Sequence, residues 1–152
     1  MLMDGGKDGV DIIEHELAVF LRRVDSARRR QPLDRSAYLL LGELDTCGPI
    51  RISALAETFQ LDISTASRQT TVLESRGLVE RLPAPEDGRV SLLQITPLGR
   101  AKLEETRTAR IALIASVIED WPEDDRREFG DYLARFNRAL ARHHRLMQDE
   151  GA

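Results

Sequence analysis

The chain has 152 residues, of which 32% are charged and 41% apolar, and its formal net charge is −4 at pH 7. This composition excludes an intrinsically disordered chain, and the length is sufficient for one domain or two small lobes with a buried core. The acidic balance argues against nucleic acid as a partner but does not exclude it, because the charge on one local face is what matters.

The cysteine content and the hydropathy of the chain indicate its cellular compartment. The one cysteine, Cys47, cannot form a disulfide within the chain, which favours a reducing, cytoplasmic setting. The first residues have no basic lead and no apolar segment, so we expect no signal peptide. No window approaches ~20 continuous apolar residues, so we expect no membrane-spanning segment.

The N-terminal part of the chain predicts a tail followed by a helix. Residues 1–9 contain three glycines and few apolar groups, which is typical of a flexible tail. From Val10 to about Arg30 apolar residues recur at helical spacing, and Pro32 cannot continue a helix. The members of this apolar stripe are Ile13, Leu17, Phe20 and Val24.

A second helix is predicted to open at Asp34 or Arg35 and to close at Gly48–Pro49. After it, Ile50 and Ile52 have the residue type of a short strand.

Two short helices joined by a tight turn come next. Ser53 is a good N-cap for a helix from Ala54 to about Phe59, and Asp62 is the N-cap of the following helix. That helix ends at Gly77, which suits a left-handed position after a helix. This arrangement predicts a helix-turn-helix unit.

Two strand-like runs follow, residues 78–82 and 90–95, and the turn signal Asp87–Gly88 lies between them. Thr96–Pro97 then opens a helix that runs to about Asp120. The middle of the chain is therefore predicted to be a winged helix-turn-helix.

A last helix is predicted from Pro122 to about Met147. Its apolar stripe has heptad-like spacing and consists of Phe129, Leu133, Phe136, Leu140 and Met147, with His143 in the gap.

The helix that begins at Ile63 has an unusual exposed face. Helical spacing places Ile63, Ala66, Thr70 and Leu73 on one side, which we expect to pack on the lobe. The other side and its flanks are short, polar side chains with one guanidinium, a set typical of a helix that enters the major groove. These candidate DNA-binding residues are Ser64, Thr65, Ser67, Arg68 and Thr71. A solvated helix face is the alternative interpretation.

From about Arg51 to Gly99 the chain resembles the MarR family of bacterial regulators (multiple antibiotic resistance regulator). The resemblance rests on "ISALAETFQLDISTASRQTTVLESRGLVERL" and "EDGRVSLLQITPLGRA". The family's Thr-x-x-Arg start is matched at Thr65 and Arg68. Its Leu-Glu-x-x-Gly-Leu-Val run is matched at residues 73–79. Its wing pattern, Asp-x-Arg and then Leu-Thr-x-x-Gly, is matched at residues 87–89 and 95–99, where Ile95 replaces the usual Leu.

The resemblance implies a mainly α fold with a small β-wing, in which a winged helix-turn-helix lobe is joined to a helical dimerisation lobe. Residues 33–99 are then the DNA-binding lobe, and residues 10–32 and 100–152 belong to the dimerisation lobe. It also implies that Arg89 at the wing tip enters the minor groove of double-stranded DNA. A narrow, electronegative minor groove attracts an arginine side chain. A plain exposed turn arginine is the alternative. We expect Asp87 to hold that guanidinium or the loop rather than to contact DNA.

The apolar stripes of the two terminal helices need a partner surface. A homodimer would cover both and would place two recognition helices about one DNA turn apart. A monomeric helical hairpin is the alternative. The run Arg28–Arg30, with Arg35, either adds phosphate contacts or is a solvated helix end.

By the same resemblance, the protein is expected to be a repressor that responds to a small aromatic or phenolic effector. Tyr38, Trp121 and the histidines are candidates for lining its site, although packing is the simpler role of the two aromatic residues. Cys47 is either a redox sensor or a small packed residue; we favour packing.

No enzyme motif, metal cluster or cofactor motif is present in the sequence, so we expect neither catalysis nor a bound cofactor. Two alternatives to a DNA-binding regulator stay open. One is a winged-helix protein-interaction module without DNA binding, which the weak basic balance favours. The other is a helical small-molecule-binding protein or enzyme, against which the absence of chemical motifs argues.

Overall fold

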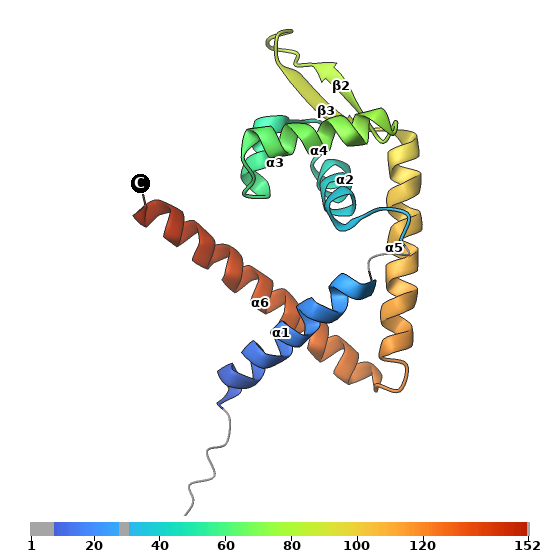
Figure 1. The fold of residues 1–152 in the computed structure, drawn as a ribbon, viewed down its shortest axis with the longest axis vertical. Coiled ribbons are helices and arrows are strands. Elements are labelled where there is room, and N and C mark those ends of the chain that lie inside the picture. Colours follow the sequence, from blue (N-terminus) through green and yellow to red (C-terminus); the bar gives the residue numbers. More distant parts are fainter. Residues whose placement is uncertain (1–7, 28–30, 152) are drawn as a thin grey trace, which may run out of the picture. The chain divides into compact units, whose positions relative to one another are not determined.

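Figure 1 shows the computed structural model of the chain, which describes residues 8–27 and 31–151. The elements follow in the order α1 (Gly9–Ala27), α2 (Arg35–Cys47), β1 (Ile50–Arg51), α3 (Ile52–Thr58), α4 (Ile63–Ser75), β2 (Val79–Pro83), β3 (Ser91–Ile95), α5 (Pro97–Val117) and α6 (Glu123–Glu150). The predicted fold class, mainly α with a small β-wing, is confirmed. The chain divides between Ala109 and Arg110 into two compact units. The lobe boundaries predicted at residues 32 and 99 separate DNA binding from dimerisation, and they stay predictions.

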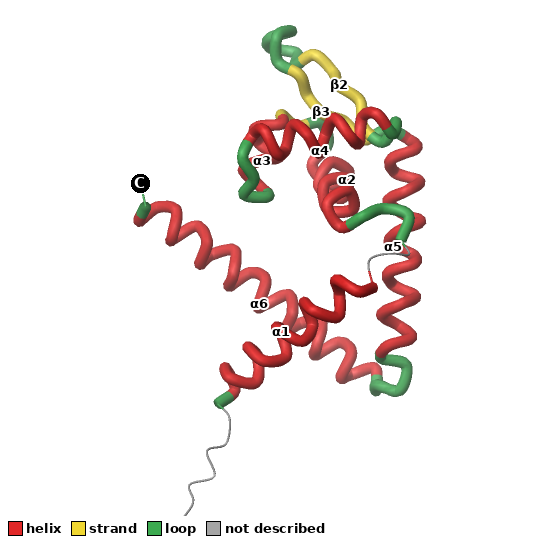
Figure 2. Tube along the Cα trace, viewed as in Figure 1, coloured by secondary structure: helices red, strands yellow, loops and turns green. Residues whose placement is uncertain are grey.

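The wing is a three-stranded antiparallel sheet in the order β1–β3–β2, drawn in yellow in Figure 2. In its register Ile50 lies opposite Leu93, and Val79 lies opposite Ile95. Successive side chains of a strand point to opposite faces. Here Leu93 and Ile95 are buried, while Gln94 between them is partly exposed. One face of the sheet therefore closes the core of the first unit.

The core of the first unit is aliphatic and is built from α2, α3, α4 and the sheet. Its buried members are Leu33, Ala37, Leu40, Leu41, Leu44, Leu55, Leu73, Leu78, Val79, Leu93 and Ile95. Three of the leucines belong to α2, where they recur at helical spacing, so α2 is the element around which α4 and the sheet are held.

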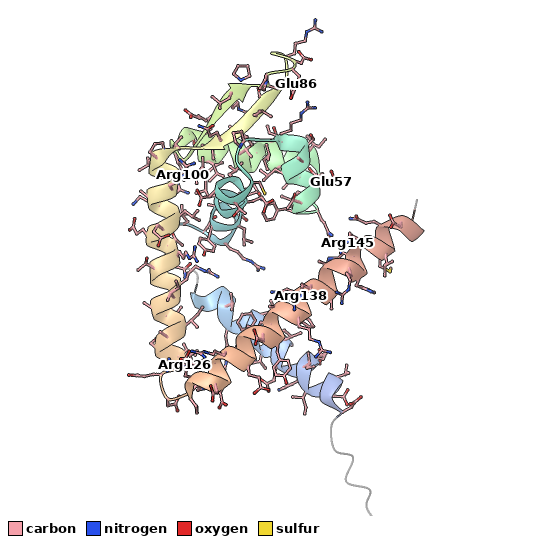
Figure 3. All side chains as sticks on the ribbon, turned by 180° about the vertical axis from the view of Figure 1, so that it is seen from behind. Glu57, Glu86, Arg100, Arg126, Arg138 and Arg145 are labelled. Atoms are coloured by element: carbon pink, nitrogen blue, oxygen red, sulfur yellow. The ribbon has the colours of Figure 1, made fainter. Side chains whose placement is uncertain are left out.

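Exposed ion pairs connect the elements around that core. Arg81 of β2 lies 2.9 Å from Glu74 of α4, and Arg100 of α5 lies 3.0 Å from Asp45 of α2. Figure 3 labels Arg100 at the start of α5 and Glu86 in the loop between β2 and β3. Exposed pairs add little stability individually; here one connects the wing to α4, and the other connects α5 to α2.

Four local predictions are wrong. Ile52 does not extend the strand, because it is the first residue of α3, and Arg51 rather than Ser53 occupies the N-cap without a side-chain cap bond. Ile63 is 63% exposed, although helical spacing places it on the same side as buried Ala66 and Leu73. Cys47 is exposed and not packed.

Other helix ends lie where the sequence places them. Asp34 accepts a hydrogen bond from the Ala37 N–H at 2.8 Å, and Gly77 follows α4 with a φ of +71°. Thr96 accepts from the Gly99 N–H and donates to the Gly77 carbonyl, so one hydroxyl connects the end of α4 to the start of α5. The positive φ at Gly77 is the conformation that favours glycine.

Gly99 lies at this junction and has no room for a side chain. A Cβ built on Gly99 would overlap the Leu78 carbonyl oxygen and lie 2.8 Å from Cγ1 of Ile95. We expect Gly99→Ala to lower the free energy of unfolding by about 1–3 kcal/mol, because a backbone oxygen cannot move aside without shifting the strand start. Denaturant unfolding of the purified protein measures this loss. The control is Gly42→Ala in α2, where a Cβ meets nothing within 4 Å and the change should stabilise the helix by about 0.5–1 kcal/mol.

The second unit contains the end of α5 and the whole of α6. The Arg126 guanidinium donates to the carbonyl oxygens of Trp121 and Glu119 at 3.1 and 2.8 Å, which satisfies backbone groups at the corner between the helices. Trp121 packs edge-on against Phe129 with ring centroids 5.6 Å apart. Trp121 thus contacts Phe129 at this corner while remaining 39% exposed.

Apolar side chains of both terminal helices are exposed. Phe20 of α1 is 58% exposed, and Phe129 and Leu133 of α6 are 46% and 44% exposed. Ile13, Leu17, Phe136 and Leu140 are exposed as well, whereas Val24 is partly buried. In the single chain, apolar side chains of both helices are therefore exposed.

Among the helices that the structure describes, none combines the length and apolar character needed to cross a membrane.

Candidate nucleic-acid interface

Helix α4 begins with a dense set of hydrogen bonds to Asp62. Its carboxylate accepts from the Thr65 N–H at 2.7 Å, from the Ser64 hydroxyl at 2.6 Å and from the Thr65 hydroxyl at 3.0 Å. The predicted N-cap is therefore confirmed, and it engages the side chains of its neighbours as well as the backbone.

These bonds stabilise the ionised carboxylate. Donation by the Ser64 hydroxyl, and then by the N–H and hydroxyl of Thr65, lowers the pKa of Asp62 to about 2. A carboxyl whose pKa is lower in the folded state contributes stability above its unfolded pKa of about 4. That contribution is lost as the pH falls through the folded value of about 2.

We therefore expect Asp62→Asn to lower the melting temperature at pH 7 but to have a progressively smaller effect between pH 4 and pH 2. Melting curves of both proteins across this range, compared at each pH, give the measurement. A difference in melting temperature that stays constant down to pH 2 would contradict the prediction.

The two sides of α4 differ as the sequence predicts, apart from Ile63. Ala66, Thr70 and Leu73 are buried against the core. On the other side Ser64, Arg68 and Thr71 are exposed, and the flanking Thr65 and Ser67 are partly buried. The structure thus places all five candidate DNA-binding residues of this helix on or beside one accessible face.

Two hydrogen bonds organise that face. The Arg68 guanidinium donates to the Thr65 hydroxyl oxygen at 3.3 Å, which joins it through Thr65 to Asp62. The Thr71 hydroxyl donates to the Ser67 carbonyl at 2.8 Å, so its proton is directed back along the helix. No residue described in the structure forms an ion pair with Arg68, which leaves its remaining N–H groups available to a ligand.

The wing tip carries Arg89 on an ordered turn. The Asp87 carboxylate accepts from the Arg89 backbone N–H at 3.0 Å, and the Asp87 carbonyl accepts from the Val90 N–H at 3.0 Å. Of the two roles predicted for Asp87, the structure shows the loop contact. The side chain of Arg89 is exposed.

Charge around the site is sparse and partly neutralised. Glu74 pairs with Arg81, and Glu86 lies 4.0 Å from Arg51. Arg68 and Arg89 are the candidate site residues that carry positive charge. The predicted contribution of Arg28–Arg30 lies outside the described residues, while Arg35 is exposed at the start of α2.

The other candidates do not form a chemical site. The Cys47 thiol donates to Glu43 at 3.1 Å, and this bond to a carboxylate raises the pKa of the thiol, which lowers the thiolate fraction that oxidation requires. Tyr38 packs against the core. In residues 8–27 and 31–151 no three His, Cys, Asp or Glu side chains are grouped in a way that could hold a metal ion.

One feature was not predicted from the sequence. A hollow of about 210 Å³ lies between α2 and α4. Its apolar wall includes Leu40, Val72 and Leu73, and Asp34 and Arg76 are its charged members. Because the hollow forms only when two helices pack, no local sequence signal could have indicated it.

Comparison with known proteins shows which sequences and structures the chain is similar to. The family model for MarR matches residues 33–91. The chain is 43% identical over 135 residues to YxaD of Bacillus subtilis, an uncharacterized HTH-type transcriptional regulator, and the match covers 86% of this chain and 94% of YxaD.

Two solved structures share the fold. A MarR family protein from Bacillus stearothermophilus superposes with a TM-score of 0.77 at 19% identity, covering 90% of this chain and 98% of that one. The transcriptional regulator PcaV from Streptomyces coelicolor, solved with its natural ligand, has a TM-score of 0.62 at 19% identity and covers 92% of this chain and 99% of its own.

Proposed function

Because the chain belongs to the MarR family of HTH-type transcriptional regulators, we propose that it binds a pseudo-palindromic DNA operator as a homodimer. Members of the family bind DNA and dimerise, and the family is one of regulators and not of enzymes. The observation that carries the proposal is the accessible face of α4, where one guanidinium lies among short hydroxyl side chains.

The proposed reading of DNA has two parts. In the major groove, Arg68 forks onto guanine O6 and N7, and Ser64, Thr65, Ser67 and Thr71 contact bases or backbone at close range. In the adjacent minor groove, Arg89 is the wing contact. The exposure of Arg68 and Arg89 and the order of the wing turn support this assignment.

Dimerisation is proposed to use the exposed apolar stripes. In α1 these are Ile13, Leu17 and Phe20 with partly buried Val24, and in α6 they are Phe129, Leu133, Phe136 and Leu140. Apolar side chains of this size are costly to leave in water at such density. A second copy would cover them and present a second α4.

We further propose that the regulator is a cytoplasmic repressor and that a small aromatic or phenolic effector releases it from DNA. The likeness of fold to a regulator solved with its ligand and the hollow beside α4 support an effector. Benzoate-type acids added to the protein–operator complex should release DNA in a titratable manner. The absence of release by any of them would remove this part of the proposal.

The first experiment is a selection from random duplex DNA with the purified full-length protein at near-physiological salt. Enrichment of a two-fold symmetric site with half-sites about ten base pairs apart is the expected result. Because few positive charges lie on the face, we expect a shallow dependence of affinity on salt.

If nothing enriches, the selection is repeated with protein that has been unfolded and refolded to remove bound ligand. A second failure would overturn DNA binding and favour the protein-interaction module.

A further inference from the structure

We propose that Asp62 determines which bases the start of α4 reads, by making this end of the helix an acceptor-only surface that selects cytosine or adenine. The inference rests on the proposed function and gives it a base preference. It concerns the triad of Asp62 and Ser64, which are exposed, and Thr65, which is partly buried.

The geometry directs both hydroxyl protons inward. Ser64 donates to one carboxylate oxygen of Asp62 at 2.6 Å, and Thr65 donates to the other at 3.0 Å. An ionised carboxylate has no proton to give, so neither hydroxyl can reverse its role. The outward side of Ser64 and Asp62, both exposed, therefore consists of oxygen lone pairs.

Such a surface distinguishes the bases in the major groove. Cytosine presents its N4 amino group and adenine its N6 amino group, whereas guanine O6 and N7 and thymine O4 are acceptors. Lone pairs bind the amino groups and repel the acceptors. Without Asp62, a serine or threonine hydroxyl could serve either kind of base, because it rotates to donate or to accept.

The same triad argues against a phosphate at this position. The Thr65 N–H, which would otherwise help to attract an anion at the helix start, is occupied by Asp62 at 2.7 Å. The negative carboxylate also repels a phosphate. The start of α4 is therefore suited to a base edge and not to the DNA backbone.

Thr65 connects this acceptor surface to Arg68. Its hydroxyl group donates to Asp62, and the hydroxyl oxygen accepts from the Arg68 guanidinium at 3.3 Å, three residues along the helix. One turn of α4 thus presents acceptors followed by a forked donor. We expect each half-site to contain a cytosine or adenine close to the guanine that Arg68 reads.

The test compares the protein with Asp62→Asn on the operator recovered by selection. Asparagine keeps one oxygen for the Thr65 N–H and is itself a favoured N-cap residue, so the helix start is kept although the melting temperature is expected to fall. The substitution replaces the second acceptor by an NH₂ donor, which frees the Thr65 hydroxyl to donate. Ser64→Ala serves as a second variant, since it removes one acceptor while leaving the cap intact.

Asp34→Asn is the matched control. Asp34 is the N-cap of α2 and accepts from the Ala37 N–H at 2.8 Å, so this variant removes the same charge from the same structural position in another helix. Dissociation constants are measured for operators in which each base pair of the half-site is replaced in turn by the other three.

For the unmodified protein, we expect one half-site position to favour cytosine or adenine over guanine and thymine by about ten-fold. Asp62→Asn and Ser64→Ala should reduce this ratio to about three-fold or less, while Asp34→Asn keeps it. A half-site without such a position, or a ratio that survives in Asp62→Asn, would overturn the inference and leave the proposed function standing. If the unmodified protein selects no DNA, the proposed function fails and this inference fails with it.

Discussion

Leu133→Glu is expected to convert the protein to a monomer and to weaken its affinity for a two-half-site operator by about 100-fold or more. Leu133 is 44% exposed in the single chain and lies in the middle of the α6 stripe between Phe129 and Phe136. A carboxylate there would have to be buried without a partner in the dimer, which association cannot compensate.

The loss of DNA affinity follows from the loss of the second half-site. In a dimer, binding of one recognition helix holds the other close to its own half-site, and the second contact is made at high effective concentration. A monomer retains its α4 and wing, so it should bind a single half-site weakly and with unchanged base preference.

The control is Ala134→Glu. Position 134 is the next residue of α6 and is also exposed, but helical geometry turns it about 100° away from Leu133, off the apolar stripe. Analytical ultracentrifugation gives the oligomeric state, and circular dichroism checks that both variants keep their helices. A Leu133→Glu protein that sediments as a dimer would remove α6 from the proposed interface.

Arg68→Ala and Arg89→Ala are each expected to weaken operator binding by about 5- to 150-fold, corresponding to the ~1–3 kcal/mol of a base-contacting arginine. Both side chains are exposed, so neither substitution should alter the dimer or the fold. Fluorescence anisotropy with a labelled operator measures the affinities.

Conservative variants separate the two roles. Arg68→Lys keeps the charge but loses the planar fork, so it should recover little of the affinity lost on a guanine. Arg89→Lys should recover more, because a narrow minor groove attracts positive charge of either kind. Arg76→Ala, which removes an exposed arginine just after the end of α4, is the control. Unchanged affinity in both alanine variants would remove the site assignment.

The sequence by itself determined most of the element boundaries. Asp62 caps its helix as predicted, the second helix opens at the predicted place, and Thr96 and Gly77 mark a start and an end that the structure confirms. Capping depends on residues three or four positions apart, so these signals are local and can be read without knowing the fold. The same is true of the polar face of α4, since helical spacing alone separates it from Ala66 and Leu73.

Only the tertiary structure decided which side chains are buried where a helix or strand ends or meets another element. Ile63 has the direction of the buried side of α4 but is exposed, because spacing gives the direction of a side chain and not how far along the helix the core extends. Cys47 is exposed at the end of α2 for the same reason.

Gly99 is a residue whose importance is visible only in the tertiary structure. Its need for glycine comes from a carbonyl oxygen about twenty residues away in the sequence, at Leu78. No local pattern records such a contact, because it arises when two segments distant in the chain pack together. The inward direction of the Ser64 and Thr65 hydroxyls is likewise a matter of atomic distance. Residue types alone permit those hydroxyls to donate or to accept, and only the position of the Asp62 carboxylate assigns their protons.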